Sequence, residues 1–353
     1  MIGKIIKIHS DFYYVNSEDK VIECKVREKL KKEKAEILVG DLVHIEEFSA
    51  DSNTGAIAGV LPRKNSLPRP SVANIDLVIV VSSIFQPELD FKQLNRYLCQ
   101  AKLYDLEAII CINKFDLDSG NKLSEKVSDI YSNLGYRVIF TSALTGEGIE
   151  DLINTLESKV SVLCGMSGVG KTSLLNKLNP ELNLRTKDIS EKSKKGTHTT
   201  RHVEILNFNT DRGQSFFVAD TPGFSYLKFD TVMPSVITEL FDEIKDFSKE
   251  CGFSDCLHIT ENNCNVLANL DKINTERYES YKLFTQEAME YKEKLYKEGH
   301  KNEKNSKFID TGSKAKKLLV KLSPQKRKNA RNTINQKINS VSILDEVYYN
   351  QEE

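Results

Sequence analysis

Short stretches of β-branched and aromatic residues, broken by turn formers, fill the first 68 residues of the chain. Residues such as Asn16-Ser17 and Gly40-Asp41 separate the stretches. The predicted strands are GKIIKI, FYYVNS, VIECKV, DLVHIEEF and AIAGVL. Five short strands in about 65 residues predict a small β-barrel. We expect an N-terminal OB-fold over residues 1–68, with another small barrel as the alternative.

The pattern changes after the proline-rich joint at residues 67–70. Continuous apolar runs now alternate with runs whose apolar residues recur every three or four positions. The predicted strands are 75–83, 107–113, 135–143, 160–165 and 214–220, and the predicted helices are 91–105 and 149–156. Strands alternating with helices predict a parallel α/β domain, to which we assign residues 69–229.

Residues 230–353 are predicted to be helical, then basic. Nine Lys or Arg and no acidic residue lie between Lys314 and Lys337. Such a run is usually a solvated surface, and contact with RNA is the alternative. The chain as a whole has 50 basic and 51 acidic residues, so any basic surface that attracts nucleic acid must be local.

Composition also bears on the setting of the protein. With 39% hydrophobic and 29% charged residues, the chain can bury a core and is not expected to be disordered. No apolar run approaches the ~20 residues that span a bilayer, and the N-terminus has no signal-peptide pattern. We therefore expect a cytoplasmic protein, a monomer, with no membrane partner.

A phosphate-binding loop is predicted at residues 165–172. GMSGVGKT matches G-x-x-x-x-G-K-[ST] between a predicted strand and the helix-like SLLNKL. Backbone N–H groups of such a loop surround phosphate oxygens, Lys171 would neutralise the β and γ phosphates, and the Thr172 hydroxyl would bind Mg²⁺. The predicted residues are Gly165, Met166, Ser167, Gly168, Val169, Gly170, Lys171, Thr172 and Ser173. A chance glycine-rich turn is the alternative.

A second phosphate motif, DTPG, ends the strand predicted at 214–220. Asp220 can hold Mg²⁺ through water, and the Gly223 N–H can contact the γ-phosphate. The motif alone would be an ordinary turn. Because a phosphate loop lies about fifty residues earlier, the two motifs together predict a nucleoside triphosphatase.

Guanine specificity is predicted at the end of the strand 107–113. The motif there is Asn113-Lys114-Phe115-Asp116. A carboxylate at Asp116 can accept both guanine N1–H and the N2 amine, a donor pair that adenine lacks, and the Lys114 stem can cover the base. Ser142-Ala143, at the end of the predicted strand 135–143, can offer a backbone N–H to guanine O6. A solvated loop is the alternative for each segment alone.

Four metal ligands are predicted near the C-terminal end. The spacing Cys251-x4-Cys256-x-His258-x5-Cys264 supplies a Cys₃His set, typical of a closed, tetrahedral structural zinc site. Seven cysteines, three of them within these fourteen residues, favour a reducing compartment with a metal site over a disulfide framework. Buried or idle cysteines are the alternative.

The order of the motifs is unusual for a GTPase. NKFD comes first, followed by SAL, GMSGVGKT, the Gly196–Thr200 segment and DTPG, whereas the phosphate loop ordinarily precedes N-K-x-D. This order indicates a circularly permuted domain, which is tolerated when the original termini lie close together.

With these motifs the chain resembles the ribosome small-subunit-dependent GTPase A family, circularly permuted GTPases of late small-subunit maturation. The matching segments run from near residue 1 to about 285 and include GDLVHI, GVLPRKNSLPRPSVANID, INKFD, TSALTGEG, GMSGVGKTSLLN, KGTHTTRHVE, VADTPGF and RYESYK. The resemblance implies an OB-fold before the GTPase domain and a zinc-binding domain after it. It also implies zinc on the four residues named above.

The residue that orients water for hydrolysis is not obvious. Phe224 follows DTPG, where many GTPases carry a glutamine, and a phenyl ring cannot hydrogen-bond water. His198 is the local candidate, which the resemblance also favours; a histidine that merely contacts phosphate or RNA is the alternative. Thr199 or Thr200 would complete the Mg²⁺ shell. We assign Thr200, although Arg201 leaves that assignment open by one position.

The resemblance implies GTP hydrolysis coupled to binding and release of the small (30S) ribosomal subunit and its rRNA, with Mg²⁺ accompanying GTP or GDP. One alternative is a GTP-gated RNA-binding factor in which nucleotide state only sets affinity. Another is a GTPase that acts away from ribosomes.

Substitution of Asp116 tests the predicted base site. Asp116→Asn should weaken GTP binding and improve binding of xanthosine triphosphate, because the amide supplies a donor where the xanthine 2-oxo group accepts. A nucleotide titration measures both. Unchanged preference for guanine would remove Asp116 from the base site.

Overall fold

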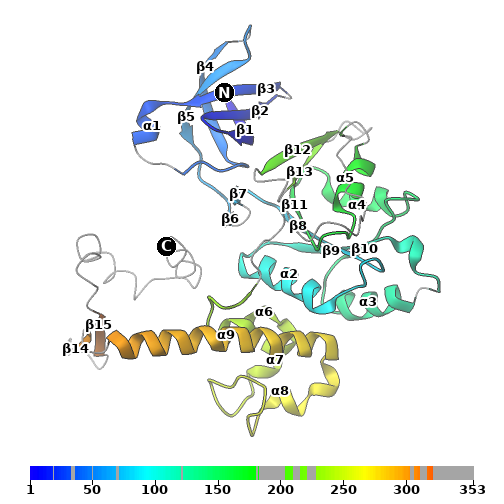
Figure 1. The fold of residues 1–353 in the computed structure, drawn as a ribbon, viewed down its shortest axis with the longest axis vertical. Helices are drawn as coiled ribbons and strands as arrows, with labels where there is room; N and C mark the ends of the chain where they lie inside the picture. Colours follow the sequence, from blue (N-terminus) through cyan, green and yellow to red (C-terminus); the bar gives the residue numbers. More distant parts are fainter. Residues whose placement is uncertain are drawn as a thin grey trace, which may run out of the picture. The chain divides into compact units, whose positions relative to one another are not determined.

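The computed structural model describes residues 1–18, 20–32, 36–49, 51–68, 71–120, 122–179, 182, 203–209, 215–220, 228–302, 306–310 and 316–320. The chain divides into two units, Met1–Leu227 and Lys228–Glu353 (Figure 1). The first unit holds a barrel and an α/β sheet, and the second is largely helical.

The barrel contains the strands β1 (Ile2–His9), β2 (Phe12–Ser17), β3 (Lys20–Val26), β4 (Leu42–Ser49) and β5 (Thr54–Val60). They pair in the order β1-β2-β3-β5-β4, and β4 returns to β1, so the barrel closes. Only the β3–β5 pair among these is parallel. The short helix α1 (Glu28–Lys32) follows β3.

Alternating apolar residues fill the barrel, as the sequence pattern requires. Inward-facing side chains from all five strands are at most 1% exposed: Ile5, Val15, Ile22, Val43 and Ile57. The prediction of a five-stranded N-terminal barrel is confirmed.

The α/β sheet has the order β10-β9-β8-β11-β13-β12. Its strands are β8 (Leu77–Ser83), β9 (Ala108–Asn113), β10 (Val138–Phe140), β11 (Val160–Cys164), β12 (Glu204–Asn209) and β13 (Ser215–Asp220). The first five in the order are parallel, as predicted, whereas β12 runs antiparallel to β13. The strand β12 was not predicted, and β10 is shorter than the predicted 135–143.

Helices cover both faces of this sheet. The helices α2 (Phe91–Leu103) and α3 (Lys122–Ser132) pack on one face, and α4 (Ile149–Leu156) and α5 (Lys171–Leu178) pack on the other. The predicted helices at 91–105 and 149–156 are therefore confirmed within two residues. A two-stranded hairpin, β6 (Ser66–Pro68) with β7 (Ser71–Ala73), precedes β8.

The second unit contains α6 (Pro234–Leu240), α7 (Asp242–Ser248), α8 (Asn265–Ala268) and the long α9 (Thr275–Asn302). Aromatic residues form its core, and the buried Arg277 pairs with Glu243 at 2.7 Å and lies 4.3 Å over the ring of Phe241. A hairpin of β14 (Ser306–Asp310) and β15 (Lys316–Val320) follows. Of the two strands, β15 lies within the stretch between Lys314 and Lys337 that was predicted only to be basic.

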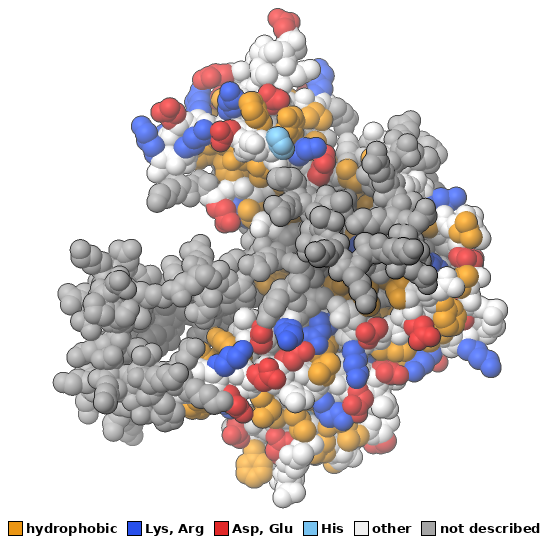
Figure 2. Space-filling view, in the orientation of Figure 1, with side chains coloured by type: hydrophobic (Ala, Val, Ile, Leu, Met, Phe, Trp, Pro, Cys, Tyr) orange, Lys and Arg blue, Asp and Glu red, His pale blue; other side chains and the backbone are white. Residues whose placement is uncertain are grey.

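Charge is distributed without a dominant sign. Figure 2 shows basic and acidic side chains intermixed on the visible face of the described residues, in keeping with the formal net charge of −1. None of the described helices is both long enough and apolar enough to cross a membrane.

Candidate nucleotide and metal sites

Four of the predicted nucleotide segments follow strands of the α/β sheet. NKFD extends from the end of β9, Ser142-Ala143 follows β10, the phosphate loop follows β11, and Asp220 is the last residue of β13. Because these strands are parallel, their carboxyl ends meet at one edge of the sheet. Segments that lie far apart in the chain are thereby brought to one place.

The phosphate loop depends on glycine at its close approaches. Gly170 has φ +95°, and a Cβ built on it would lie 2.2 Å from Nδ2 of Asn113. A Cβ on Gly165, whose φ is +148°, would lie 2.1 Å from the carbonyl oxygen of Val81. Both the conformation and the space therefore exclude a side chain. The helix α5 begins at Lys171, within the last residues of this motif.

Lys171 lies over its own loop. Its Nζ donates to the carbonyl oxygens of Gly165 at 2.7 Å and Met166 at 2.8 Å. Thr172 and Ser173 follow in the first turn of α5 and are half-buried. An ammonium group and the backbone N–H groups at a helix start form a cationic setting suited to phosphate.

Asn113 connects three segments of this edge. The side chain is 1% exposed, and its Nδ2 donates to the carbonyl oxygen of Val169 in the phosphate loop at 2.9 Å. Its Oδ1 accepts from the backbone N–H of Ala143 at 3.2 Å and from Thr141 Oγ1 at 3.4 Å. The base-recognition loop, the Ser142-Ala143 segment and the phosphate loop therefore share one buried amide.

Lys114 adds a second connection. Its Nζ donates to the carbonyl oxygen of Gly168 at 2.8 Å and to that of Gln86, in the loop after β8. Burial lowers the pKa of the Lys114 ammonium, and the charge of Asp116 opposes that shift. Lys114 itself has φ +60°, which turns the chain into the short 3-10 helix Phe115–Leu117.

The side chain of Asp116 is exposed, but a hydrogen bond fixes its orientation. Its Oδ1 accepts a hydrogen bond from the hydroxyl of the buried Ser142, and that hydroxyl accepts from the Thr145 N–H at 3.1 Å. The preceding Phe115 ring packs 5.3 Å from the ring of Phe140, centroid to centroid. One carboxylate oxygen is thus held while the exposed side chain faces outward.

Several predicted residues lie outside the described part of the chain. They are His198, Thr199, Thr200 and Gly223, and only the backbone of Asp220 is described. Conversely, sequence reasoning missed the supporting roles of Thr141, Thr145 and the Gln86 backbone. A partial signal was present, since Gln86 lies just beyond a predicted strand, where the carboxyl edge must be.

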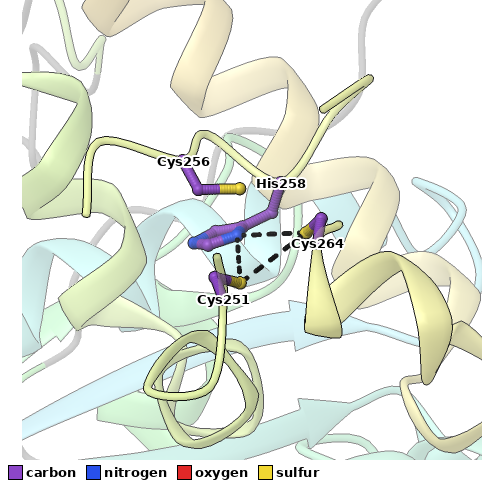
Figure 3. A group of neighbouring side chains, drawn as sticks. All are labelled: Cys251, Cys256, His258 and Cys264. Carbon is purple, nitrogen blue, oxygen red and sulfur yellow. Dashed lines mark hydrogen bonds between the residues drawn. The ribbon is translucent and has the colours of Figure 1, made fainter. Parts of the chain in front are cut away.

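The four predicted metal ligands come together in the second unit. Their ligand atoms all lie within 4.8 Å of one another, and Figure 3 shows the side chains of Cys251, Cys256, His258 and Cys264 converging. The Sγ atoms of Cys251 and Cys264 are 3.8 Å apart, and they lie 3.5 and 3.4 Å from Nδ1 of His258.

The three distances among Cys251, His258 and Cys264 fit tetrahedral coordination of one ion. Metal–sulfur bonds of about 2.3 Å and a metal–nitrogen bond of about 2.0 Å place two sulfurs about 3.8 Å apart, and a sulfur and a nitrogen about 3.5 Å apart. The ligand set is also largely buried: Cys256, His258 and Cys264 are 8%, 3% and 5% exposed. The cluster could therefore hold a metal ion with a closed coordination shell.

The backbone around the cluster is fixed by outer hydrogen bonds. Glu261 accepts from the backbone N–H groups of Leu257, Ile259 and Thr260 at 2.8, 2.8 and 3.0 Å. Burial raises the pKa of the Glu261 carboxyl, but these backbone donors outweigh it and lower the pKa below its ordinary value. The hydroxyl of Tyr278 donates to the His258 carbonyl oxygen at 2.8 Å. Such outer contacts orient ligands before an ion binds.

The remaining cysteines lie away from this cluster. Cys24, Cys99, Cys111 and Cys164 are free and buried in the first unit. Burial raises the pKa of the Cys111 thiol to about 11. They behave as small apolar core residues.

Family models match most of the chain. The model described as RsgA N-terminal domain matches residues 2–57, and the model described as RsgA GTPase matches residues 60–230. A third model, described as 50S ribosome-binding GTPase, matches residues 160–304.

Relatives and solved structures that match most of the chain point to the same family as these models. Small ribosomal subunit biogenesis GTPase RsgA of Bacillus cytotoxicus is 42% identical over 82% of this chain and 98% of that protein. The protein of the same name from Caldanaerobacter subterraneus subsp. tengcongensis is 38% identical over 84% and 98%. The crystal structure of YjeQ from Thermotoga maritima matches with a TM-score of 0.70 and 36% identity, over 82% of this chain and 98% of that one.

The permuted order also has a structural counterpart. The structure of YloQ, described as a circularly permuted GTPase, matches with a TM-score of 0.66 and 34% identity, over 82% of this chain and 94% of that one. The permutation expected from the motif order is therefore confirmed.

Substitution of Asn113 tests whether its amide holds the site together. Asn113→Asp places a carboxylate oxygen against the Val169 carbonyl oxygen and leaves that acceptor unpaired. An unpaired buried group costs about 1–3 kcal/mol, which favours separation of the two loops. Because nucleotide must then bring the loops together against that cost, GTP and GDP should both bind roughly 5- to 150-fold more weakly. Fluorescence titration with a labelled guanine nucleotide measures this.

The matched control is Asn133→Asp, the same change at an exposed position beyond α3. It should leave both affinities unchanged. If the Asn113 and Asn133 variants bind nucleotide equally well, the amide does not organise the site.

Proposed function

Because the chain belongs to the RsgA GTPase family, we propose that it hydrolyses GTP during late maturation of the small ribosomal subunit. Hydrolysis would be coupled to binding and release of the subunit and its rRNA. The observation that carries the proposal is the buried Asn113, whose amide contacts both the phosphate loop and the Ser142-Ala143 segment. A guanine nucleotide needs those two regions at a fixed separation.

The names of the relatives favour the small subunit as the partner. The relatives that cover four-fifths of this chain are named small ribosomal subunit biogenesis GTPases. The description 50S ribosome-binding GTPase belongs to a model that matches residues 160–304 and leaves the barrel outside. The relatives' name carries more weight, because their match extends over more of the chain than that model does.

The base end of the site is assigned to the loops after β9 and β10. Asp116 would accept from guanine N1–H and the N2 amine, with Ser142 keeping its carboxylate in place. Asn113, Lys114 and Phe115 would frame the base loop, and the Ala143 region would lie at guanine O6. Adenine presents no matching donor pair to Asp116.

The phosphate end is assigned to the loop before α5. The backbone from Gly165 to Gly170 would surround the β and γ phosphates, and Lys171 would exchange its contacts with its own loop for phosphate oxygens. Thr172, Ser173, Asp220 and Gly223 would complete this end. Bound with GTP, Mg²⁺ supplies charge neutralisation for the phosphates.

Hydrolysis itself would require a residue that orients water. Phe224 cannot do so, and His198 is our candidate, while Thr200 would complete the Mg²⁺ shell. Support for both comes from the sequence motif, since they lie outside the described residues.

Cys251, Cys256, His258 and Cys264 would hold one structural zinc ion. Their number, donor types and spacing in space match a closed Cys₃His site, and an ion there would stabilise the loops around α8. We assign the OB-fold to residues 1–68, the permuted GTPase domain to 69–229 and the zinc-binding helical domain with its basic tail to 230–353. The protein would act as a cytoplasmic monomer.

GTP turnover in the presence of purified ribosomal subunits tests the proposed function. Small subunits should stimulate turnover strongly, and large subunits should not. Lys171→Ala should reduce turnover by at least about a hundredfold, since a positioned charge on the β and γ phosphates is lost. Lys122→Ala, at an exposed position in α3, should behave as wild type.

Two results would contradict the proposal. Equal stimulation by large subunits would assign a different partner. Nucleotide-dependent binding of small subunits without any stimulated turnover would indicate a GTP-gated binding factor instead of an enzyme acting through hydrolysis.

Metal analysis of a ligand variant tests the zinc assignment. Cys256→Ala should reduce bound zinc from one ion per chain to nearly none and remove hydrogen-exchange protection from residues 228–302, because structural zinc contributes folding free energy. Guanine nucleotide affinity should stay within about twofold, since no predicted nucleotide residue lies in this unit.

Cys24→Ala, a buried cysteine of the barrel, is the control and should retain the zinc. The assignment fails if wild-type protein prepared without chelator contains no zinc, or if the Cys256 variant keeps a full equivalent.

A further inference from the structure

The barrel and the α/β sheet meet edge to edge. Strand β1 pairs antiparallel with β12, and the register places Lys7 opposite Glu204. The strand order therefore continues as β13-β12-β1 (Figure 1). Lys7 Nζ also lies 3.1 Å from each oxygen of the Glu204 carboxylate. We call the contact formed by Lys4, Lys7, Glu204 and Phe217 the β1–β12 joint.

The joint has cationic and apolar parts. Lys4 Nζ lies 4.4 Å from the centre of the Phe217 ring on β13. Burial lowers the pKa of the Lys4 ammonium, while the charge of Asp76 opposes that shift. Ile6 and Ile8 of β1 pack against the same core that holds Ile205 of β12. The barrel strand is thus fitted to this edge by several kinds of contact.

Glu204 also lies beside Asp220, one of the predicted magnesium-binding residues. On its other side, β12 pairs with β13, and the register places Glu204 opposite Asp220. Lys7, Glu204 and Asp220 therefore form one row across three adjacent strands. In sequence, three residues separate Glu204 from Thr200. A residue of the joint therefore lies opposite the strand end that would respond to the γ-phosphate.

A separate contact anchors the barrel independently of this joint. The Ala73 N–H donates to the Val39 carbonyl oxygen at 2.8 Å, and Asn74 Nδ2 donates to that of Gly40 at 3.0 Å. Arg63 pairs with the fully buried Asp41 at 2.7 Å. The barrel would therefore stay attached to the α/β domain if the joint opened.

The ion pair is the weakest contact of the joint. The side chains of Lys7 and Glu204 are 39% and 43% exposed, and ion pairs in such settings contribute little net stability. A separate anchor together with an exposed ion pair at the edge allows the barrel edge to shift while the barrel stays attached. The weak contact is the one next to the nucleotide segments.

We propose that the β1–β12 joint couples nucleotide state to the barrel, closing when GTP is bound and loosening with GDP. The proposal rests on the proposed GTPase function. A γ-phosphate with its Mg²⁺ at Asp220 would fix the end of β13, which pairs with the start of β12, where Glu204 faces Lys7. Loss of that phosphate releases the start of β12 and with it the barrel edge.

Thermodynamic linkage makes this coupling measurable without ribosomes. If GTP closes the joint, a closed joint must tighten GTP binding by the same factor. Breaking the joint should then weaken a non-hydrolysable GTP analogue selectively and leave GDP unaffected.

The experiment is a titration of the full chain with GDP and with the analogue, at one fixed salt concentration because a half-exposed ion pair is screened by salt. Lys7→Glu and Glu204→Lys should each weaken the analogue about fivefold relative to GDP, the low end of typical coupling. The double exchange, Lys7→Glu with Glu204→Lys, should restore the wild-type ratio within about twofold. Glu47→Lys, an exposed barrel residue away from the joint, controls for the change in charge.

Each outcome decides the matter. Equal weakening of both nucleotides, no weakening, or a double exchange that fails to restore the ratio would overturn the coupling while leaving the proposed GTPase function in place. Failure of the wild-type chain to bind either guanine nucleotide would overturn the proposed function itself, and the coupling with it.

Discussion

The hydrogen bonds of one buried amide hold the candidate nucleotide site together. Asn113 ends β9, yet it contacts the phosphate loop after β11 and the segment after β10. Gly170 must lack a side chain because the Asn113 amide occupies that space. Lys114, the next residue, makes a second connection of this kind, because its Nζ donates to the carbonyl oxygens of Gly168 in the phosphate loop and of Gln86. Base loop and phosphate loop are therefore fixed relative to each other by neighbouring residues of one motif.

This bracing explains why the permuted chain order is harmless. The site depends on which strand ends are adjacent in space, and the parallel pairs β10–β9, β9–β8 and β8–β11 provide that adjacency whatever the order of synthesis. The order does decide what each strand connects to. Here β12 adjoins the barrel edge, and the chain beyond β13 leads to the unit that holds the metal cluster.

Sequence patterns predicted the motifs and their strands well because both depend on local spacing. Residues 160–178 show this, with an apolar strand, glycines and a helix in sequence. They did not predict β12, because its EILNFN pattern fits a strand only when β13 lies beside it, nor α3, although Val127, Ile130 and Tyr131 have helical spacing. The spacing of Cys251, Cys256, His258 and Cys264 predicted a cluster, whereas the bracing by Glu261 and Asn113 depends on tertiary contacts that no local pattern contains.

The central claim is that the loops at the carboxyl edge of the sheet form one guanine nucleotide site. Calorimetric titration of the wild-type chain with GDP and, separately, with ADP tests it most directly. A carboxylate positioned like Asp116 rejects a base without the matching donors by large factors. GDP should bind at one site per chain, and ADP at least about a hundredfold more weakly. Equal affinity for the two nucleotides would contradict the account.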